Sequence, residues 1–274
     1  MNEIQKTAFI GFGNMARALV NGALLANPLQ KDHIIVSSPS LHNGTRSTPL
    51  PIAKNNREAA RHADIIFLCT KPNVISSICT EIADVIIEKD HKPLIVSIAA
   101  GITTNTIEQH LQCNNMPIVR AMPNTPVSVG LGVIGYYANS FVTPQQITQI
   151  TAILESTGVL VQVKDEDDLD KLTAISGSGP AYFLLIEEML VNATKNLGLT
   201  DEIAYILVKQ TMLGTSVMAS ESPLRFEELR TQVTSKGGTT AAAINQLIEG
   251  GIEQLVNDAV LAAYHRAIEL RSAT

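Results

Sequence analysis

The segment Ile10-Gly11-Phe12-Gly13-Asn14-Met15-Ala16 decides how this chain folds. It stands between Lys6–Ile10, an apolar run that predicts a buried strand, and Met15–Ala26, an Ala- and Leu-rich stretch that predicts a helix. In a parallel α/β sheet, the pattern G-x-G-x-x-A gives a tight turn at the first glycine and close approach of a pyrophosphate at the second. The helix N-terminus adds unpaired N–H groups and a partial positive charge. We therefore expect the backbone of residues 11–15 to hold a dinucleotide, with an ordinary tight turn as the alternative.

Composition sets the broad class of the protein. The chain has 274 residues, 45% of them apolar, and a formal net charge of −6. This allows two domains with substantial cores and argues against a general affinity for nucleic acid or anionic membranes. The sequence contains no uninterrupted run of about 18 apolar residues, so we expect no membrane span. Met1–Lys6 lacks the pattern of a signal peptide. The cysteines, Cys69, Cys79 and Cys113, have no metal-ligand spacing and are expected to be small buried residues. We expect a cytoplasmic enzyme with a small-molecule substrate and no metal.

Strand-like and helix-like segments alternate through the first part of the chain. Further strands are expected at His33–Val36, Asp64–Leu68, Pro93–Ser97, Met116–Arg120, Gly130–Tyr137 and Gly158–Val163. Helices are expected at Pro72–Ile87 and Thr104–Leu111, and Thr143-Pro144 is a typical helix start. The polar stretch Leu41–Pro51 is expected to be a loop. The alternation predicts an α/β domain of the Rossmann type over residues 1–163, with a doubly wound, mostly parallel sheet.

The pattern changes after the acidic run Lys164–Asp168, which is expected to be a solvated linker or helix cap. Helices are expected at Leu169–Leu197, Asp201–Ser220, Glu227–Val233, Thr240–Ile248 and Ile252–Leu270, without further strands. We place the domain boundary near Val163 and assign residues 164–274 to an all-α domain. Because these helices carry few charges on any face, each needs to bury more than one face. We therefore expect a dimer or larger oligomer formed through this half.

The end of the second strand bears on the choice of coenzyme. NAD-binding sheets usually carry an acidic residue there, whereas this strand ends in Ser37-Ser38-Pro39. Hydroxyl groups can bond a 2′-phosphate that a carboxylate would repel, so we expect NADPH to be preferred over NADH. Other donors expected nearby are those of Arg46, Lys54, Asn56 and Arg57. The alternative, that the serines only turn the chain, stays open.

Two further segments follow strands at the carboxyl edge of the sheet, where ligands bind in this architecture. Cys69-Thr70-Lys71-Pro72 is expected to line the cofactor, with Lys71 as a plain surface charge the alternative. Val119–Pro126 is stiffened by two prolines. Within it, the amide of Asn124 is expected to face a nicotinamide; the alternative is that it supports the local backbone.

Two glycine-rich segments stand out in the helical half. Ala174–Ala181 (AISGSGPA) interrupts a helical stretch and indicates either close helix packing or a substrate pocket. Val233–Ala243 (VTSKGGTTAAA) leads from a Gly-Gly turn into a helix whose free N–H groups suit a carboxylate, with simple threonine capping as the alternative. None of the six histidines lies in these segments, so no general base is evident. A protonated cyclic imine, which is already an electrophile for hydride, fits such a site.

Over essentially its whole length the chain resembles the pyrroline-5-carboxylate reductases. The resemblance rests on Phe9–Met15, Lys71-Pro72, Arg120–Pro126, Thr173–Tyr182 and Val233–Thr240. The last three together, in this order and spacing, are highly specific. The resemblance implies a Rossmann domain, a helical domain interlocked in a dimer, and higher rings such as decamers. It also implies NADPH-dependent reduction of (S)-1-pyrroline-5-carboxylate to L-proline, the last step of proline biosynthesis.

The resemblance assigns roles to single residues as well. Ser38 and Asn56 match 2′-phosphate contacts. The backbone of Gly237-Gly238-Thr239 matches the seat of the substrate carboxylate, and Thr240 matches the catalytic threonine that bonds the ring nitrogen. Lys236 replaces the usual proline, which frees a backbone N–H and loosens the loop. Two other functions stay open: reduction of a six-membered imine, and NADPH binding without turnover by a sensor or scaffold.

Overall fold

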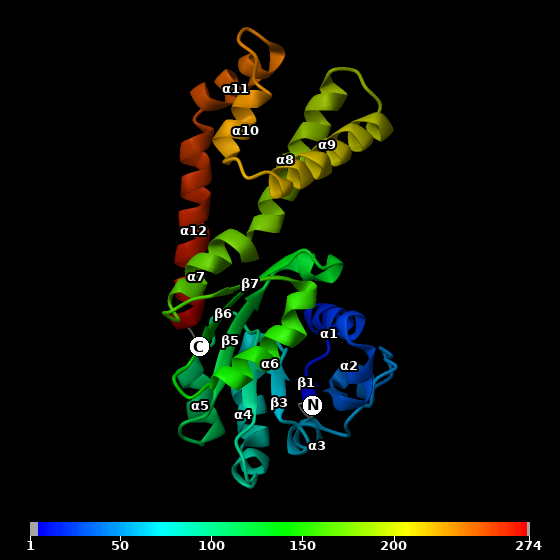
Figure 1. Ribbon diagram of the computed structural model, residues 1–274, viewed down its shortest axis with the longest axis vertical. Helices are drawn as coiled ribbons and strands as arrows, with labels where there is room; N and C mark the ends of the chain where they lie inside the picture. Colours follow the sequence, from blue (N-terminus) through cyan, green and yellow to red (C-terminus); the bar gives the residue numbers. More distant parts are fainter. Residues whose placement is uncertain (1–4, 273–274) are drawn as a thin grey trace. The chain divides into compact units, whose positions relative to one another are not determined.

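The computed structural model describes residues 5–272, without the side chains of residues 28–30, so most of Met1–Lys6 lies outside the described residues. The first part of the chain forms a seven-stranded sheet in the order β2-β1-β3-β4-β5-β6-β7, several strands of which are labelled in Figure 1. All neighbouring strands are parallel except β5 and β6. The strands are β1 (Thr7–Ile10), β2 (Ile34–Ser37), β3 (Ile65–Leu68), β4 (Leu94–Ser97), β5 (Ile118–Pro123), β6 (Gly132–Ala138) and β7 (Gly158–Gln162).

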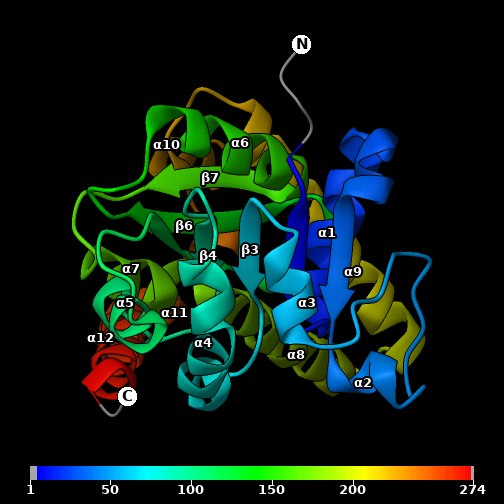
Figure 2. The same ribbon diagram turned by 90° about the horizontal axis from the view of Figure 1, so that it is seen from below.

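Helices cover both faces of this sheet because its central strands are apolar on both sides. The helices are α1 (Asn14–Ala26), α2 (Pro39–His42), α3 (Asn56–Arg61), α4 (Pro72–Ile87), α5 (Thr104–Leu111) and α6 (Pro144–Leu154), with short helical turns η1 (Pro28–His33), η2 (Thr125–Val129) and η3 (Glu155–Thr157). One core cluster joins the sheet to α1 and α6, and the other joins it to α3, α4 and α5. Helices α4 and α5 lie side by side in Figure 2. The predicted doubly wound architecture is confirmed.

The local predictions for this part are largely confirmed. Helices α4 and α5 have the predicted bounds, and Thr143 caps α6 in a capping box with Gln146. The predicted loop Leu41–Pro51 is wrong at its start, because Leu41 and His42 belong to the short helix α2. Pro39 at the first position of α2 favours that helical turn.

The contacts divide the chain into two compact units. The sheet unit comprises Met1–Ser178 and Ala263–Thr274, and the helical unit comprises Gly179–Ala262. The helical unit contains α8 (Gly179–Asn196), α9 (Asp201–Glu221), α10 (Phe226–Gln232), α11 (Thr239–Glu249) and the first part of α12 (Ile252–Ser272). The predicted boundary near Val163 falls inside the sheet unit. As a boundary between independently folding domains it stays a prediction.

The single helix predicted over Leu169–Leu197 is wrong. The chain forms α7 (Asp168–Leu172), then a π-helical turn η4 (Thr173–Gly177), and only then α8. The N–H of Ser178 donates to the carbonyl of Thr173 at 2.9 Å, which widens the turn. Pro180 has no N–H, so the carbonyl of Ser176 cannot receive its ordinary helical bond. The two local causes, a wide turn and a missing donor, explain why the helix is interrupted here.

The helical unit has a very small core. Its buried cluster consists of Val191, Ala204 and Val208. Large apolar side chains on α8 and α9 are instead exposed, such as Phe183 at 65% and Ile206 at 61%. Among the described residues, no helix combines the length and the apolar character that crossing a bilayer requires.

Candidate active site

The glycine-rich turn lies where β1 ends, beside the ends of β2 and β3. Gly11 has φ +89°, and its N–H donates to the carbonyl of Ser37 at 2.8 Å. A Cβ at Gly11 would come within 2.7 Å of the carbonyl oxygen of Cys69, so only glycine fits the turn. A Cβ at Gly13 would meet nothing within 4 Å. The first glycine thus serves the fold, and the second leaves open space above the backbone.

The N-terminus of α1 opens into the same space. The helix has no side-chain cap and no acidic residue in its first turn. The first backbone bond along this helix is made by Arg17, which donates to the carbonyl of Gly13 at 3.1 Å. The N–H groups of the preceding helical residues therefore point out of the helix without a backbone acceptor. Such an end favours a phosphate group, and the expected dinucleotide seat at residues 11–15 fits this geometry.

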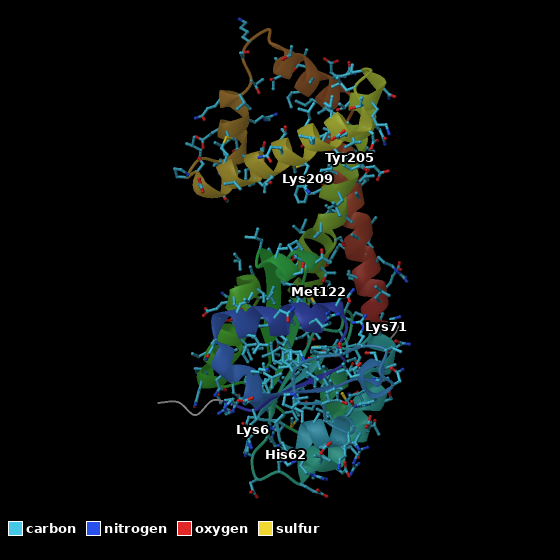
Figure 3. All side chains as sticks on the ribbon, turned by 90° about the vertical axis from the view of Figure 1, so that its right-hand side faces the viewer. Lys6, His62, Lys71, Met122, Tyr205 and Lys209 are labelled. Carbon is cyan, nitrogen blue, oxygen red and sulfur yellow. The ribbon has the colours of Figure 1, made fainter. Side chains whose placement is uncertain are left out.

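Thr70 adds a second sign of a ligand at this edge. Its hydroxyl oxygen is buried and has no hydrogen-bond partner among the described residues. Its methyl carbon lies 2.6 Å from where a Cβ of Gly11 would stand, so Thr70 adjoins the turn. Lys71 follows as an exposed residue, and Pro72 begins α4. In Figure 3, Lys71 and Met122 mark this carboxyl edge, and Lys6 and His62 lie at the opposite one. A buried hydroxyl without a partner is costly unless a ligand supplies one.

The structure brings together two of the residues expected near the 2′-phosphate. The hydroxyl of Ser37 is fully buried and donates to Oδ1 of Asn56 at 2.7 Å. The amide nitrogen of Asn56 donates to Glu81 on α4 at 2.8 Å. Ser38 is also buried, with its hydroxyl 3.0 Å from that of Ser40. Both serines thus lie in a polar group at the end of β2, next to the glycine-rich turn.

Two of the arginines expected near the 2′-phosphate, Arg57 and Arg46, make different contacts. Arg57 pairs with Asp84 and donates to the carbonyl of Glu81 at 3.3 Å, so its guanidinium is held on α4. That pairing lowers the pKa of the Asp84 carboxyl below its ordinary value. Arg46 instead reaches the glycine-rich turn, where it donates to the carbonyl of Phe12 at 3.2 Å.

The expectation that Asn124 offers its amide to a nicotinamide is not supported by its contacts. Asn124 is buried at the end of β5, and its Oδ1 accepts from the N–H of Val133 at 2.9 Å. Its Nδ2 donates at 3.0 Å to the carbonyl of Ser176, the group that Pro180 leaves without a helical donor. Asn124 therefore follows the structural alternative. It satisfies the backbone of β6 and of the π-helical turn.

The acidic run is expected to be a solvated linker or a helix cap, and for Glu166 the first alternative is wrong, because its carboxylate lies at the start of α5. Both of its carboxylate oxygens accept hydrogen bonds from Thr104, one from the N–H and one from the hydroxyl, each at 2.9 Å. Arg120 on β5 lies 3.4 Å from Glu166 and 3.3 Å from Asp170. The side chains of Arg120 and Asp170 are only 4% and 2% exposed. An isolated buried charge is costly, so these groups depend on one another.

The C-terminal end of α12 completes this buried network. Arg271 pairs with Asp167, and it lies 3.2 Å from the second carboxylate oxygen of Asp170. Gly101, with φ +78°, allows the backbone of Leu270 to approach, because a Cβ there would lie 3.1 Å from the Leu270 carbonyl. The network was missed in the sequence, where the only signal was a buried-strand arginine, Arg120, and a run of acids.

The glycine-rich turn of the helical unit forms a second candidate site. Gly237 has φ +72°, and Gly238 is the N-cap of α11 and donates to the carbonyl of Ser235 at 3.0 Å. Helix α11 has no side-chain cap and no acidic residue in its first turn. Threonine capping, the alternative to an anion seat, is therefore not observed. The N–H groups of Thr239 and Thr240 have no backbone acceptor within the helix, and the end suits a carboxylate.

The cysteines and other metal-binding side chains contribute no reactive group to either site. Burial raises the pKa of the Cys79 thiol to about 12 and also raises that of Cys69. The predicted burial is confirmed for Cys79, whereas Cys69 and Cys113 are partly exposed. The described residues include no cluster of three or more His, Cys, Asp or Glu side chains that could hold a metal ion. What the two sites offer is backbone N–H groups and hydroxyls.

Comparison with known proteins extends over the whole chain. Residues 166–270 match the family described as pyrroline-5-carboxylate reductase dimerisation, and residues 6–101 match the family described as NADP oxidoreductase, coenzyme F420-dependent. The pyrroline-5-carboxylate reductase of Pseudomonas aeruginosa is 39% identical over 97% of this chain and 96% of its own length. That of Staphylococcus haemolyticus is 35% identical over 97% of each.

Solved structures give the same result. A pyrroline-5-carboxylate reductase from Coxiella burnetii is 40% identical and superposes with a TM-score of 0.89, covering 98% of this chain and 99% of that one. The pyrroline carboxylate reductase of Plasmodium falciparum, solved with NADP bound, is 33% identical with a TM-score of 0.86 and the same coverage.

Proposed function

The chain belongs to the pyrroline-5-carboxylate reductase family, and on that premise we propose which of its residues hold the coenzyme and the substrate. Its activity is the reduction of 1-pyrroline-5-carboxylate to proline with NAD(P)H, as in its full-length relatives. The observation that carries the assignment is the uncapped start of α11 behind the turn Gly237-Gly238, because it provides anion-binding N–H groups without a competing carboxylate.

The coenzyme site is proposed at the carboxyl edge of β1, β2 and β3. The uncapped N-terminus of α1 receives the pyrophosphate, and the open space at Gly13 admits it. The unpartnered hydroxyl of Thr70 bonds the coenzyme nearby. The bound reduced coenzyme supplies the hydride. The residues proposed to bind the coenzyme are Gly11, Phe12, Gly13, Asn14, Met15, Ser37, Ser38, Asn56, Thr70, Lys71 and Pro72.

The preference for NADPH over NADH stays a proposal. It is supported by the polar group at the end of β2, where Ser37 and Asn56 bond each other and Ser38 lies beside Ser40. In favour of it, no acidic residue stands at the end of the strand. Against it, Glu81 lies within hydrogen-bond distance of Asn56.

The substrate is proposed to bind at the start of α11. The backbone N–H groups of Gly237 and Thr239 hold its carboxylate, and the Thr240 hydroxyl bonds the ring nitrogen. Gly238 forms the N-cap of this seat, because its own N–H is bonded to the Ser235 carbonyl. The chain then needs no strong acid of its own, because the protonated imine is already electrophilic. Holding the ring in one orientation lowers the entropic part of the barrier, which is how positioning alone accelerates a reaction.

The family's dimerisation domain indicates that the chain assembles with copies of itself. We propose that the assembly is a homodimer formed through the exposed apolar faces of α8 and α9, with a decamer as the higher assembly. We also propose that the enzyme works in the cytoplasm, since its three cysteines are free thiols, as a reducing compartment requires.

The decisive experiment follows NADPH absorbance after addition of 1-pyrroline-5-carboxylate, with proline quantified as the product. The proposal expects stoichiometric formation of proline. Faster turnover of the six-membered homologue would identify a different imine reductase, and NADPH binding without oxidation would identify a sensor. The variant Thr240→Ala should lower turnover with an unchanged dissociation constant for NADPH, and Thr240→Ser, which keeps the hydroxyl, should retain most activity. Unchanged turnover of Thr240→Ala would reject the role given to Thr240.

A further inference from the structure

One arginine of the loop after β2 contacts the glycine-rich turn. The guanidinium of Arg46 donates from one nitrogen to the carbonyl of Phe12 at 3.2 Å and from another to the side chain of Asn14 at 3.5 Å. Its backbone N–H donates to the carbonyl of Ser40 at 2.8 Å. Arg46 therefore spans from the end of β2 to the turn between β1 and α1.

The loop around Arg46 is held by its own hydrogen bonds. Thr45 donates its hydroxyl to the carbonyl of Ser40 at 3.1 Å, and its N–H donates to the side chain of Asn43 at 3.1 Å. Ser40 in turn lies beside the buried Ser38. The loop is thus folded back onto the strand end where the polar group for a 2′-phosphate lies. The backbone of Arg46 thus lies beside Ser40 at the end of β2, and its guanidinium extends to Phe12 and Asn14 in the glycine-rich turn.

The charge of Arg46 is not neutralised by the rest of the described chain. Among the described residues, no carboxylate lies within ion-pair distance of the Arg46 guanidinium. Arg57, by contrast, is paired with Asp84. Phe12 and Asn14 offer only neutral oxygens. A guanidinium has five N–H donors, and these two bonds leave others free. An exposed, unpaired arginine with free donors is suited to bidentate binding of a phosphate.

We propose that Arg46 binds the 2′-phosphate of NADPH and is a main source of the preference for NADPH over NADH. Ser38 and Asn56 supply neutral bonds to the same group, and Arg46 supplies the opposite charge. The carboxylate of Glu81 on α4, which accepts a hydrogen bond from Asn56, repels a phosphate at this place and so opposes its binding. The inference rests on the proposed coenzyme site, and it goes beyond it by naming a residue that distinguishes the two coenzymes.

The test measures binding directly by titration calorimetry, with NADPH, NADH, 2′,5′-ADP and 5′-AMP as the probes. The variant Arg46→Met should weaken binding of NADPH and 2′,5′-ADP by about 10- to 100-fold, the effect of losing one charge-assisted bond. Binding of NADH and 5′-AMP should stay unchanged. Arg46→Lys, which keeps the charge but loses the planar fork, should be intermediate. Arg61→Met, which removes an exposed arginine from the end of α3 near the amino end of β3, is the charge-matched control and should bind all four probes like the parent protein.

Equal weakening of NADPH and NADH by Arg46→Met would overturn the proposal, because it would show that Arg46 contacts the pyrophosphate or only supports the turn. Unchanged binding of all four probes would overturn it as well. The outcome does not depend on turnover. A parent protein that binds 2′,5′-ADP but does not reduce 1-pyrroline-5-carboxylate would refute the proposed function and still allow the role of Arg46 to be decided.

Discussion

The sheet unit and the helical unit differ in where they keep their apolar side chains. In the sheet unit, Phe9 and Phe67 are fully buried and stacked 4.5 Å apart, within a core that extends over both faces of the sheet. In the helical unit, Phe183 and Leu184 are 65% and 63% exposed. Helices α8 and α9 also line open grooves, one of about 630 Å³ whose walls include Leu184, Tyr205 and Lys209. Figure 3 labels Tyr205 and Lys209 on α9.

The difference shows that one chain combines two ways of becoming stable. The sheet unit removes apolar area from water within its own fold, at roughly 25 cal/mol per Å². The helical unit leaves that gain unrealised until another surface covers it. Exposed apolar area of this extent is typical of an obligate interface. The stability of the helical unit is therefore expected to depend on protein concentration, and that of the sheet unit much less.

The largest effect is expected from placing a charge on the apolar face of the helical unit. Leu184→Glu should convert the oligomer to monomers and abolish activity, because a carboxylate cannot be buried there without a partner. Leu25→Glu changes an even more exposed leucine, 86% exposed on α1, and should alter stability by no more than about 0.5 kcal/mol. Light scattering after size exclusion measures the mass of both. An oligomer that survives Leu184→Glu would show that this face of the helical unit is not the interface, so the contrast with the sheet unit would not hold.

The next effect concerns ion pairs inside and outside the sheet unit. Arg120→Met should destabilise the protein by about 3–5 kcal/mol, because it leaves Glu166 and Asp170 without their buried partner. Arg57→Met removes a pair whose side chains are 44% and 49% exposed, and should cost at most about 1 kcal/mol. Urea unfolding followed by circular dichroism compares the two variants. Equal losses would mean that burial is not what gives the network its strength.

A smaller contrast is expected at two glycines with positive φ, one in each unit. At Gly11 and Gly237 alike, alanine should cost about 1–2 kcal/mol for the left-handed backbone. At Gly11 the contact with Cys69 should add about 1–3 kcal/mol of overpacking, and nothing comparable adjoins Gly237. Thermal unfolding and NADPH titration of Gly11→Ala and Gly237→Ala test this. NADPH binding should be lost only in the first variant.

The smallest effect is a difference in thiol reactivity. Because burial raises the pKa of Cys79 to about 12 and also raises that of Cys69, both remain neutral thiols at pH 8. Thiolate is the reactive form, so iodoacetamide should modify them slowly. Cys113, which is partly exposed, should react first. Peptide mass spectrometry over time gives the order, and early modification of Cys79 would show that the sheet unit opens more readily than its core indicates.

The sheet was predictable from sequence because its signals are local. Fully buried strands such as Ile65–Leu68 read as short apolar runs, and capping residues such as Thr143 fix where helices begin. The glycine-rich turns were predictable for the same reason, since a positive φ at Gly11 and at Gly237 demands glycine.

The misinterpreted features depend on residues far apart in the sequence. Whether Glu166 is solvated is decided by Thr104 and Arg120, and whether Asn124 faces a ligand is decided by a carbonyl that Pro180 deprives of its donor. Neither follows from periodicity. The interruption of the helix at Thr173–Gly177 did have a local signal, the proline and glycines, but that signal does not specify a π-helical turn.

The return of the C-terminal residues to the sheet unit has a consequence for biosynthesis of the chain. A ribosome makes Leu270 and Arg271 after the whole helical unit, so the pairing of Arg271 with Asp167 and the approach of Leu270 to Gly101 form only after residues 179–262 have been synthesised. Until then, Asp170 lacks its second arginine. The nascent nucleotide-binding unit therefore stays incomplete while the whole helical unit is being made. The exposed apolar faces of α8 and α9 are therefore already synthesised when the sheet unit is completed.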